Sequence, residues 1–238
     1  MASDKPSGGA TITRVDGATL GRERALTELR RAIHVGDLAP GQRLIEAELA
    51  GTLGVTRASI RGALLALTAD GLVERIPNRG ARVRPVSLLE AVQITECRMM
   101  LESLCAAKAA EHASGEQVAY LADLGDRMRV AAEAGEPLKY SELNREMHRY
   151  IQLISGQDTA TGLLGRLNAQ LVRHQFRLAL RPGRSQVSLG EHLEIIAAIM
   201  ARDPVRAEQA VRAHLLSVIA ALTATDPDVD MKQLHNVR

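Results

Sequence analysis

Residues 36–80 read GDLAPGQRLIEAELAGTLGVTRASIRGALLALTADGLVERIPNRG. Apolar positions at helical spacing predict a short helix over 46–53 and a second helix that begins after Thr56. Gly54 can end the first helix, because glycine tolerates the left-handed backbone found just past a helix end. Thr56 supplies the hydroxyl of a good N-cap. With a further apolar helical pattern over 20–35, these residues predict a helix-turn-helix.

Two extended runs follow the second helix. Leu72–Ile76 and Ala81–Arg84 flank Pro77–Gly80, a turn sequence with hairpin character. The N-terminal third is therefore expected to contain three helices and a two-stranded wing.

The remaining chain shows helical patterns only. Breaks at glycine and proline predict helices over 87–112, 115–134, 137–154, 158–180 with an interruption, 185–201 and 204–223. The predicted fold class is mainly α, a winged helix-turn-helix joined to an all-α helical bundle. Such a bundle can hold a ligand between facing helices.

Four segments follow from these breaks. They are a flexible N-terminal arm over 1–20, a winged helix-turn-helix DNA-binding domain over 21–86, an all-helical domain over 87–225 and a flexible tail over 226–238.

Composition argues against several classes of protein. Aromatic residues make up 2% of the chain, so a base-stacking platform for RNA or single strands is disfavoured. No apolar run approaches the roughly 20 residues of a membrane span, and the first residues lack the pattern of a secretory signal. Cys97 and Cys105 lie eight residues apart in one predicted helix, too far to pair. We therefore expect a cytoplasmic protein without a membrane partner.

Positive charge is concentrated in the predicted winged domain. Residues 21–86 contain 11 Arg and Lys against 7 Asp and Glu, whereas residues 87–238 contain 17 against 19. A basic module joined to a slightly acidic one suggests that a polyanion binds at one end, although a solvated surface explains most such patches.

The second helix of a helix-turn-helix enters the major groove with its first residues near base edges. Arg57 and Arg61 lie four residues apart, so they project from one face of the helix. Each could hydrogen-bond to a guanine edge or to a phosphate. The hydroxyls of Thr56 and Ser59 suit phosphates beside the positive helix N-terminus. Arg79 and Gly80 at the wing tip could approach the minor groove. The alternative is a solvated arginine-rich helix in another small domain.

These residues resemble the winged helix-turn-helix of GntR-family transcription regulators over about 65 residues. The resemblance is carried by Gly36-Asp37-Leu38-x-Pro40-Gly41-x-Arg43-Leu44-x-Glu46, Leu49-Ala50, Leu53-Gly54-Val55-Thr56-Arg57, Arg61, Ala63-Leu64, Leu67, Asp70-Gly71-Leu72-Val73 and Arg79-Gly80. It implies that Arg57, Arg61 and Asn78–Gly80 contact operator DNA. Gly62 departs from the Glu usual in the family, and Ala47 departs from an Arg that contacts DNA in some members.

The helical part contains histidines that could share an ion. Asn144 and His148 lie four residues apart on one helix, while His192 and His214 lie on two others. Three imidazoles and one oxygen would suit Zn²⁺ or Ni²⁺. From spacing alone, surface or hydrogen-bonded core histidines remain the commoner alternative.

The helical part also resembles the FCD effector domain of FadR-type GntR regulators. The matching residues are Arg98-x-x-Leu101-Glu102, Ala106-Ala107, Ala109-Ala110, Asn144-x-x-x-His148, Glu191-His192-x-x-Ile195, Asp203, Ala207 and His214-Leu215. The resemblance implies that residues 87–225 bind an effector and dimerise, and that the four candidate ligands hold a divalent transition metal. Asn144 stands where metal-binding members commonly have Asp, which implies weaker binding or a different ion.

Arg98 has two interpretations. It could form two parallel hydrogen bonds to the carboxylate of a small effector beside the metal, because the effectors of the family it resembles are often small organic acids. Alternatively, it could form an ion pair with Glu102, four residues later.

The predicted function is a DNA-binding regulator, most simply a repressor relieved by a small carboxylate. It would act as a homodimer on double-stranded operator DNA with an inverted repeat. One alternative makes the metal itself the signal, with no organic effector. Another is a metal-dependent hydrolase, but no HExxH motif supplies a base, and Glu146 lies two residues from both Asn144 and His148, so it points elsewhere. We therefore expect no enzyme.

Overall fold

The computed structural model describes residues 17–77 and 79–224, and it divides after Val83 into two compact units. Asn78, most of the predicted arm and the whole predicted tail lie outside the described residues. The two units are considered separately below.

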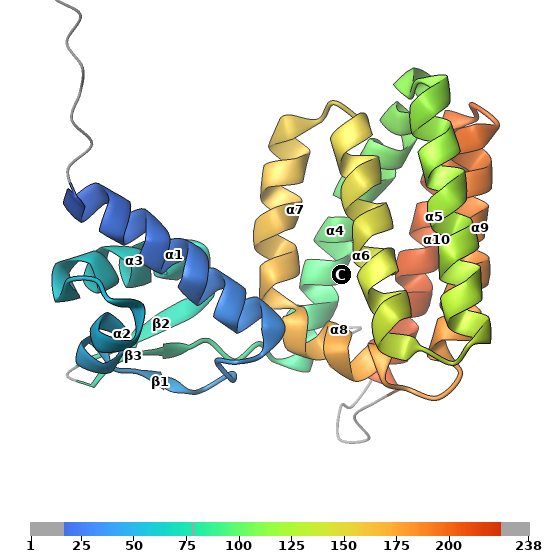
Figure 1. Cartoon of the computed structure of the whole chain (residues 1–238). Helices are drawn as coiled ribbons and strands as arrows, with labels where there is room; N and C mark the ends of the chain where they lie inside the picture. Colours follow the sequence, from blue (N-terminus) through green and yellow to red (C-terminus); the bar gives the residue numbers. More distant parts are fainter. Residues whose placement is uncertain (1–16, 78, 225–238) are drawn as a thin grey trace, which may run out of the picture. The chain divides into compact units, whose positions relative to one another are not determined.

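The first unit consists of three helices and a small antiparallel sheet (Figure 1). Its elements are α1 (Gly17–Val35), β1 (Arg43–Leu44), α2 (Glu46–Leu53), α3 (Arg57–Ala69), β2 (Val73–Ile76) and β3 (Gly80–Val83). β2 and β3 form the predicted hairpin, and β1 adds a third strand on the free side of β3. The winged helix-turn-helix is confirmed, whereas β1 was missed because two residues are too short to show strand alternation.

The helix that was expected over 20–35 begins at Gly17 instead. Residues 17–20 therefore belong to α1 rather than to the predicted arm. Ala18 and Leu20 favour helix, and no proline interrupts this stretch. Further along, Ala25 and Leu29 of α1 are buried together with Ile60 and Leu67 of α3, and this shared core orients α3.

Helices are the only regular secondary structure in the described residues of the second unit (Figure 1). Its elements are α4 (Leu88–His112), α5 (Gly115–Glu133), α6 (Pro137–Ile154), α7 (Asp158–Gln170), α8 (Val172–Ala179), α9 (Arg184–Met200) and α10 (Pro204–Thr223). The expected interruption in 158–180 falls at Leu171, between α7 and α8. The predicted all-α bundle is confirmed.

The bundle core positions the candidate site. α4 packs along α10, and α9 packs against both α5 and α10. Met147 of α6 and Ile195 and Ile199 of α9 are fully buried in this core. His148 directly follows Met147 on α6, and His192 lies one turn before Ile195 on α9. Both histidines are therefore held inside the bundle.

None of the described helices combines the length and the apolar character needed to cross a bilayer.

Candidate functional site

The exposed face of α3 carries the two arginines that the sequence selected. Arg57 is the first residue of α3, and Arg61 lies one turn later with 67% of its side chain exposed. Ile60 and Leu64, on the opposite face, are buried in the first unit. The Arg61 guanidinium lies 3.3 Å from Glu46 Oε2, an exposed pair of the kind that contributes little to stability. Both cations are thus presented on the surface by a rigid helix.

Thr56 is the N-cap of α3, because its hydroxyl accepts a hydrogen bond from the backbone N–H of Ser59. Ser59 itself is only 4% exposed, and its hydroxyl oxygen accepts a hydrogen bond from the Thr56 hydroxyl at 3.0 Å. The expectation that Ser59 contacts a phosphate stays a prediction, and its side chain is largely buried in this structure. The first turn of α3 directs this side chain toward α1, where Gly21 leaves room for it.

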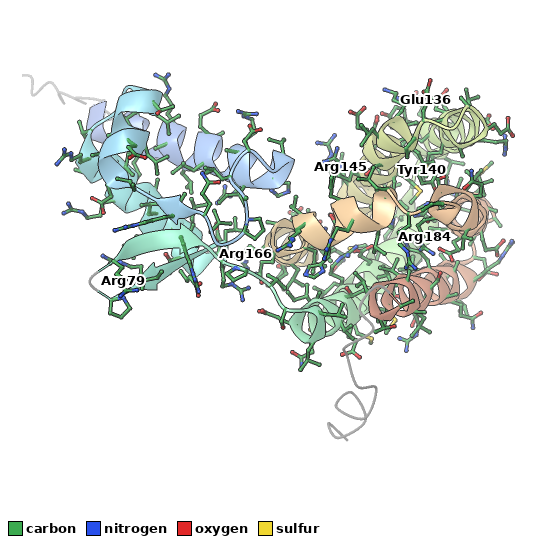
Figure 2. All side chains as sticks on the ribbon, turned by 90° about the horizontal axis from the view of Figure 1, so that it is seen from below. Arg79, Glu136, Tyr140, Arg145, Arg166 and Arg184 are labelled. Atoms are coloured by element: carbon green, nitrogen blue, oxygen red, sulfur yellow. The ribbon has the colours of Figure 1, made fainter. Side chains whose placement is uncertain are left out.

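Arg79 and Gly80 lie at the tip of the wing, where both are exposed (Figure 2). Gly80 has a φ of 86°, in the left-handed region that favours glycine. The turn is therefore built around a glycine, as its sequence suggests. Asn78, the third wing residue in the prediction, lies outside the described residues.

Gly62 lies where α3 meets the side chain of Arg22 on α1. An added Cβ would lie 3.0 Å from Arg22 Cδ, and Arg22 is exposed and can shift. We expect Gly62→Ala to raise the free energy of unfolding by up to about 1 kcal/mol, the helix preference of alanine over glycine. Chemical denaturation measures this, with Gly51→Ala in α2, where a Cβ has no neighbour within 4 Å, as the control. A loss of stability would contradict the expectation and show that Arg22 is fixed.

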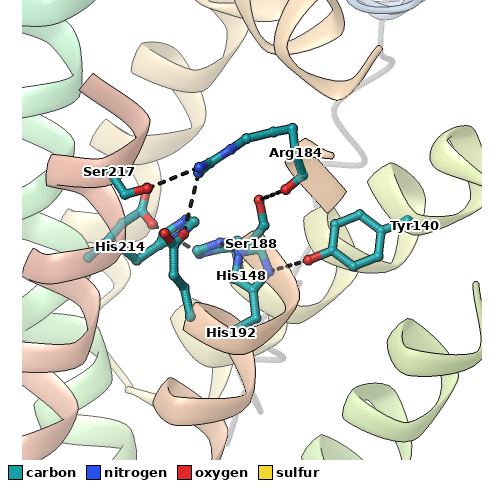
Figure 3. A network of polar contacts seen from close by, with 9 residues as sticks. Tyr140, His148, Arg184, Ser188, His192, His214 and Ser217 are labelled. Atoms are coloured by element: carbon teal, nitrogen blue, oxygen red, sulfur yellow. Dashed lines mark hydrogen bonds and ion pairs between the residues drawn. The ribbon is translucent and has the colours of Figure 1, made fainter. Parts of the chain in front are cut away.

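Three histidines converge inside the bundle (Figure 3). His148 comes from α6, His192 from α9 and His214 from α10, and one nitrogen of each lies within 4.8 Å of the others. The Nε2 atoms of His148 and His192 are 3.3 Å apart. The ring centroids of His192 and His214 are 4.4 Å apart. Residues far apart in the sequence thus form a single cluster, which we call the histidine cluster.

The second ring nitrogen of each histidine faces a different partner. His192 Nδ1 lies 2.8 Å from the Tyr140 hydroxyl, and His214 Nδ1 lies 2.8 Å from Glu191 Oε2. His148 Nδ1 lies 3.0 Å from Glu102 Oε2. Ring orientation and tautomer are commonly set in this way at metal sites, because an outer partner that binds Nδ1 leaves Nε2 free to coordinate.

An arginine pairs with each of the two carboxylates. Arg98 donates to Glu102 Oε1 from Nε at 2.9 Å, and both side chains are almost fully buried. Arg184, the first residue of α9, donates to Glu191 at 3.3 Å and to the Ser217 hydroxyl at 3.0 Å (Figure 3). Arg98 therefore forms the ion pair that the sequence left open as an alternative, and a contact of its guanidinium with a small carboxylate stays a prediction.

Burial and charge set the protonation of these groups. Burial alone would raise the pKa of Glu102, but Arg98 and His148 outweigh it, and the pKa lies well below its ordinary value. Burial also lowers the pKa of His192 far below that of free histidine, and the neighbouring His214 and His148 lower it further. The pKa of His214 is lowered by burial as well, against the opposing effect of Glu191. His192 and His214 are therefore held neutral, the form that binds metal.

Asn144 lies one turn before His148 on α6. Its side-chain carbonyl oxygen is buried, and it has no hydrogen-bond partner within the described part of the chain. An unpaired buried acceptor costs stability, and such a group calls for a ligand or another explanation. The residues of the histidine cluster and this oxygen match the N and O donors that Zn²⁺ accepts.

A small cavity adjoins His148. A cavity of about 10 Å³ is lined by Glu102, Cys105, His148, Ile151, Gln152 and Val211, roughly the room for one water molecule. Glu102 lines this cavity, and its Oε2 atom lies 3.0 Å from His148 Nδ1.

Tyr140, Arg184 and Glu191 were not predicted as site residues. Glu191 directly precedes His192, but its partner is His214 on another helix, so only the packing of α9 against α10 reveals the contact. Tyr140 precedes Asn144 by one turn of α6, and this spacing was the one available signal.

Comparisons with known proteins agree with this division. The model of the FCD domain matches residues 93–217, and the model of bacterial regulatory proteins of the gntR family matches residues 22–83. The HTH-type transcriptional repressor NanR of Salmonella newport is 30% identical over 220 residues, which cover 81% of this chain and 82% of NanR. The HTH-type transcriptional repressor RspR of Escherichia coli is 27% identical over 190 residues, covering 80% and 83%.

A solved structure shows the same fold. E. coli McbR/YncC superposes with a TM-score of 0.74 at 23% identity, covering 86% of this chain and 97% of the other. Both matching families and the relatives named here are DNA-binding regulators rather than enzymes. The chain therefore belongs to the GntR family of bacterial transcription regulators, with a gntR-type DNA-binding domain followed by an FCD domain.

Proposed function

We propose that the chain is a repressor whose FCD domain holds a divalent transition metal and responds to a small carboxylate. The DNA-binding part of this function follows from the family. The metal part rests on one observation above all: three histidines converge while the Nδ1 atom of each already faces Tyr140, Glu102 or Glu191. When bound, Zn²⁺ or Ni²⁺ would supply a positively charged centre with positions open to an anion.

His148, His192 and His214 would hold the ion, with Asn144 offering one oxygen. The chain would act as a homodimer, since an inverted-repeat operator requires two recognition helices about 34–36 Å apart. The effector would act by favouring one spacing of these helices over another.

A direct test measures DNA binding while metal and carboxylate are varied independently. The full chain, freed of metal with a chelator, is titrated with Zn²⁺ or Ni²⁺ in the presence and absence of a panel of small carboxylates. We expect the affinity for DNA to change only when both are present. If chelation and reloading leave DNA binding unchanged with every acid tested, the metal-dependent function is refuted.

A second candidate makes the metal alone the signal. It is favoured by the engagement of Arg98 with Glu102 and by the small cavity beside His148. The same titration separates the two, because a metal sensor responds to Zn²⁺ or Ni²⁺ without any acid.

Glu191→Gln tests the outer partners of the histidine cluster. The substitution keeps the size of the side chain but removes the charge that orients His214, so metal affinity should fall about 10- to 100-fold. A competition titration against a chromophoric chelator measures the affinity. Glu194→Gln is the matched control, because Glu194 lies on the same helix and pairs with Arg206 on the surface. Equal metal affinity in both variants would contradict the role assigned to Glu191.

A further inference from the structure

Residues 159–190 concentrate positive charge in the second unit. They contain five arginines and no Asp or Glu, whereas the rest of residues 87–238 contains 12 Arg and Lys against 19 Asp and Glu. The segment includes α8, which lies across the end of the bundle at which α4 begins (Figure 1). A unit that is otherwise acidic therefore carries a basic helix at this end, the kind of charge distribution that attracts a polyanion.

Two of the five arginines have partners inside the second unit. Arg181 and Arg184 donate hydrogen bonds to groups on α9 and α10. The other three, Arg166 on α7 and Arg173 and Arg177 on α8, are exposed and form no hydrogen bond or ion pair in the described part of the chain. We call Arg173 and Arg177 the α8 basic pair.

The spacing of the α8 basic pair favours an anionic partner. Arg173 and Arg177 lie four residues apart on α8, so their side chains leave the helix on one face. Like charges at this spacing repel and weaken a helix, and an anion that contacts both relieves the repulsion. Guanidinium groups bind phosphate oxygens through paired N–H donors, so the pair suits a ligand with several phosphates.

Contacts within the second unit hold α8 against the chain that leaves the wing. His174, between the two arginines, donates from Nε2 to the Val86 carbonyl oxygen at 2.9 Å. Arg84 donates to Gln170 Oε1, at the end of α7, at 2.7 Å. Val86 follows the last residue of β3 by three residues, which span at most about 11 Å. This short connection keeps α8 close to DNA bound by the wing, in any orientation of the two units.

We infer that the α8 basic pair is a second DNA-binding surface, which contacts phosphates flanking the operator half-site without regard to base sequence. The inference goes beyond the proposed function, because it rests on the DNA binding of the family and not on the metal site. Phosphate contacts add affinity that depends on salt and carry no sequence information. The helical domain would thereby lengthen the stretch of DNA that the chain covers.

The test is a fluorescence-anisotropy titration of the full chain with two duplexes. One contains only the operator selected from a random pool, and the other adds about 10 base pairs of arbitrary sequence, one helical turn, at each end. Arg173→Ala/Arg177→Ala should bind the short duplex as the unaltered chain does and the long duplex more weakly. Each lost contact removes about 0.9 units of salt slope, so two lost contacts should make the fall in long-duplex affinity between 50 and 200 mM salt about tenfold smaller.

Two further variants separate a phosphate contact from a change in overall charge. Arg127→Ala/Arg129→Ala removes the same charge from exposed positions on α5, so it is the matched control and should retain the long-duplex affinity. Arg173→Lys/Arg177→Lys should retain most of the salt slope, because lysine also binds phosphate as a point charge. Circular dichroism checks that each variant folds.

The inference is overturned if the alanine variant of the α8 basic pair binds the long duplex as the unaltered chain does. An equal loss on both duplexes, or an equal loss in the α5 control, also overturns it. Phe176 is exposed on α8 as well, so a second copy of the chain is the alternative occupant of this face. Analytical ultracentrifugation decides, because a change of oligomeric state in the alanine variant would assign the face to a subunit contact instead.

Discussion

Arg57→Ala is expected to weaken operator binding by about 1–3 kcal/mol, or roughly 5- to 150-fold, with no loss of folding stability. Arg57 begins the recognition helix α3, and its side chain is exposed. Its removal therefore leaves the buried face of α3 intact. The measurement is a fluorescence-anisotropy titration with DNA that the unaltered chain has selected from a random pool, so the operator sequence need not be known beforehand.

Salt dependence tells which kind of contact Arg57 makes. A contact to a guanine edge adds discrimination between sequences, so its loss should relax specificity at one base pair. A contact to a phosphate should instead weaken binding to every sequence and reduce the salt dependence by about one unit of slope. Arg127→Ala is the matched control, because Arg127 is an exposed arginine on α5, paired with Asp123. An Arg57→Ala variant that binds DNA as tightly as this control would contradict the assignment of α3 as the helix that contacts DNA through Arg57.

The fold of the first unit could be predicted because its signals are local. Gly54 adopts the left-handed backbone at the end of α2, with a φ of 62°, and Thr56 caps α3 through its own hydroxyl. Both depend on residues within four positions along the chain. β1 could not be predicted, since its two residues become a strand only by pairing with Ala81 and Arg82 of β3.

The candidate site was only partly predictable, because some of its contacts join residues that are far apart in the sequence. The spacing of Asn144 and His148 on one helix is local, whereas the meeting of three helices at one point depends on packing. Ser59 shows that a shift of two residues along a helix changes which side chains are exposed. Ser59 is two residues from Arg57, yet the helical rotation between them buries Ser59 and exposes Arg57.

The partners of Arg98 and His214 show what spacing alone leaves undecided. Glu102 lies one turn after Arg98, so both an ion pair and a free guanidinium were compatible with the sequence. Burial decides between them, because an arginine enclosed in the bundle requires a nearby negative charge. Glu191 and His214 are 23 residues apart, and no periodicity links them.

His192→Ala is expected to abolish stabilisation of the chain by zinc. At a metal concentration about 100-fold above its dissociation constant, binding adds about 2.7 kcal/mol of stability, or roughly 5–10 °C in Tm for a domain of this size. His192 is fully buried, and its Nε2 lies 3.3 Å from His148 Nε2 at the centre of the cluster. Losing it should cost more affinity than the 10- to 100-fold that an outer partner is worth. Differential scanning fluorimetry with and without zinc measures the shift.

Each variant is compared with its own metal-free form, since removal of a buried side chain also lowers the starting Tm. His148→Ala provides a second variant with a less buried side chain, should His192→Ala not fold. His112→Ala is the control, because His112 lies on α4 with 65% of its side chain exposed, outside the histidine cluster. All three variants lose one imidazole, so His112→Ala controls for the loss of a histidine outside the cluster. A zinc-induced shift that persists in His192→Ala would mean that zinc binds elsewhere, and the convergent histidines would then be a neutral polar core held by Tyr140, Glu102 and Glu191.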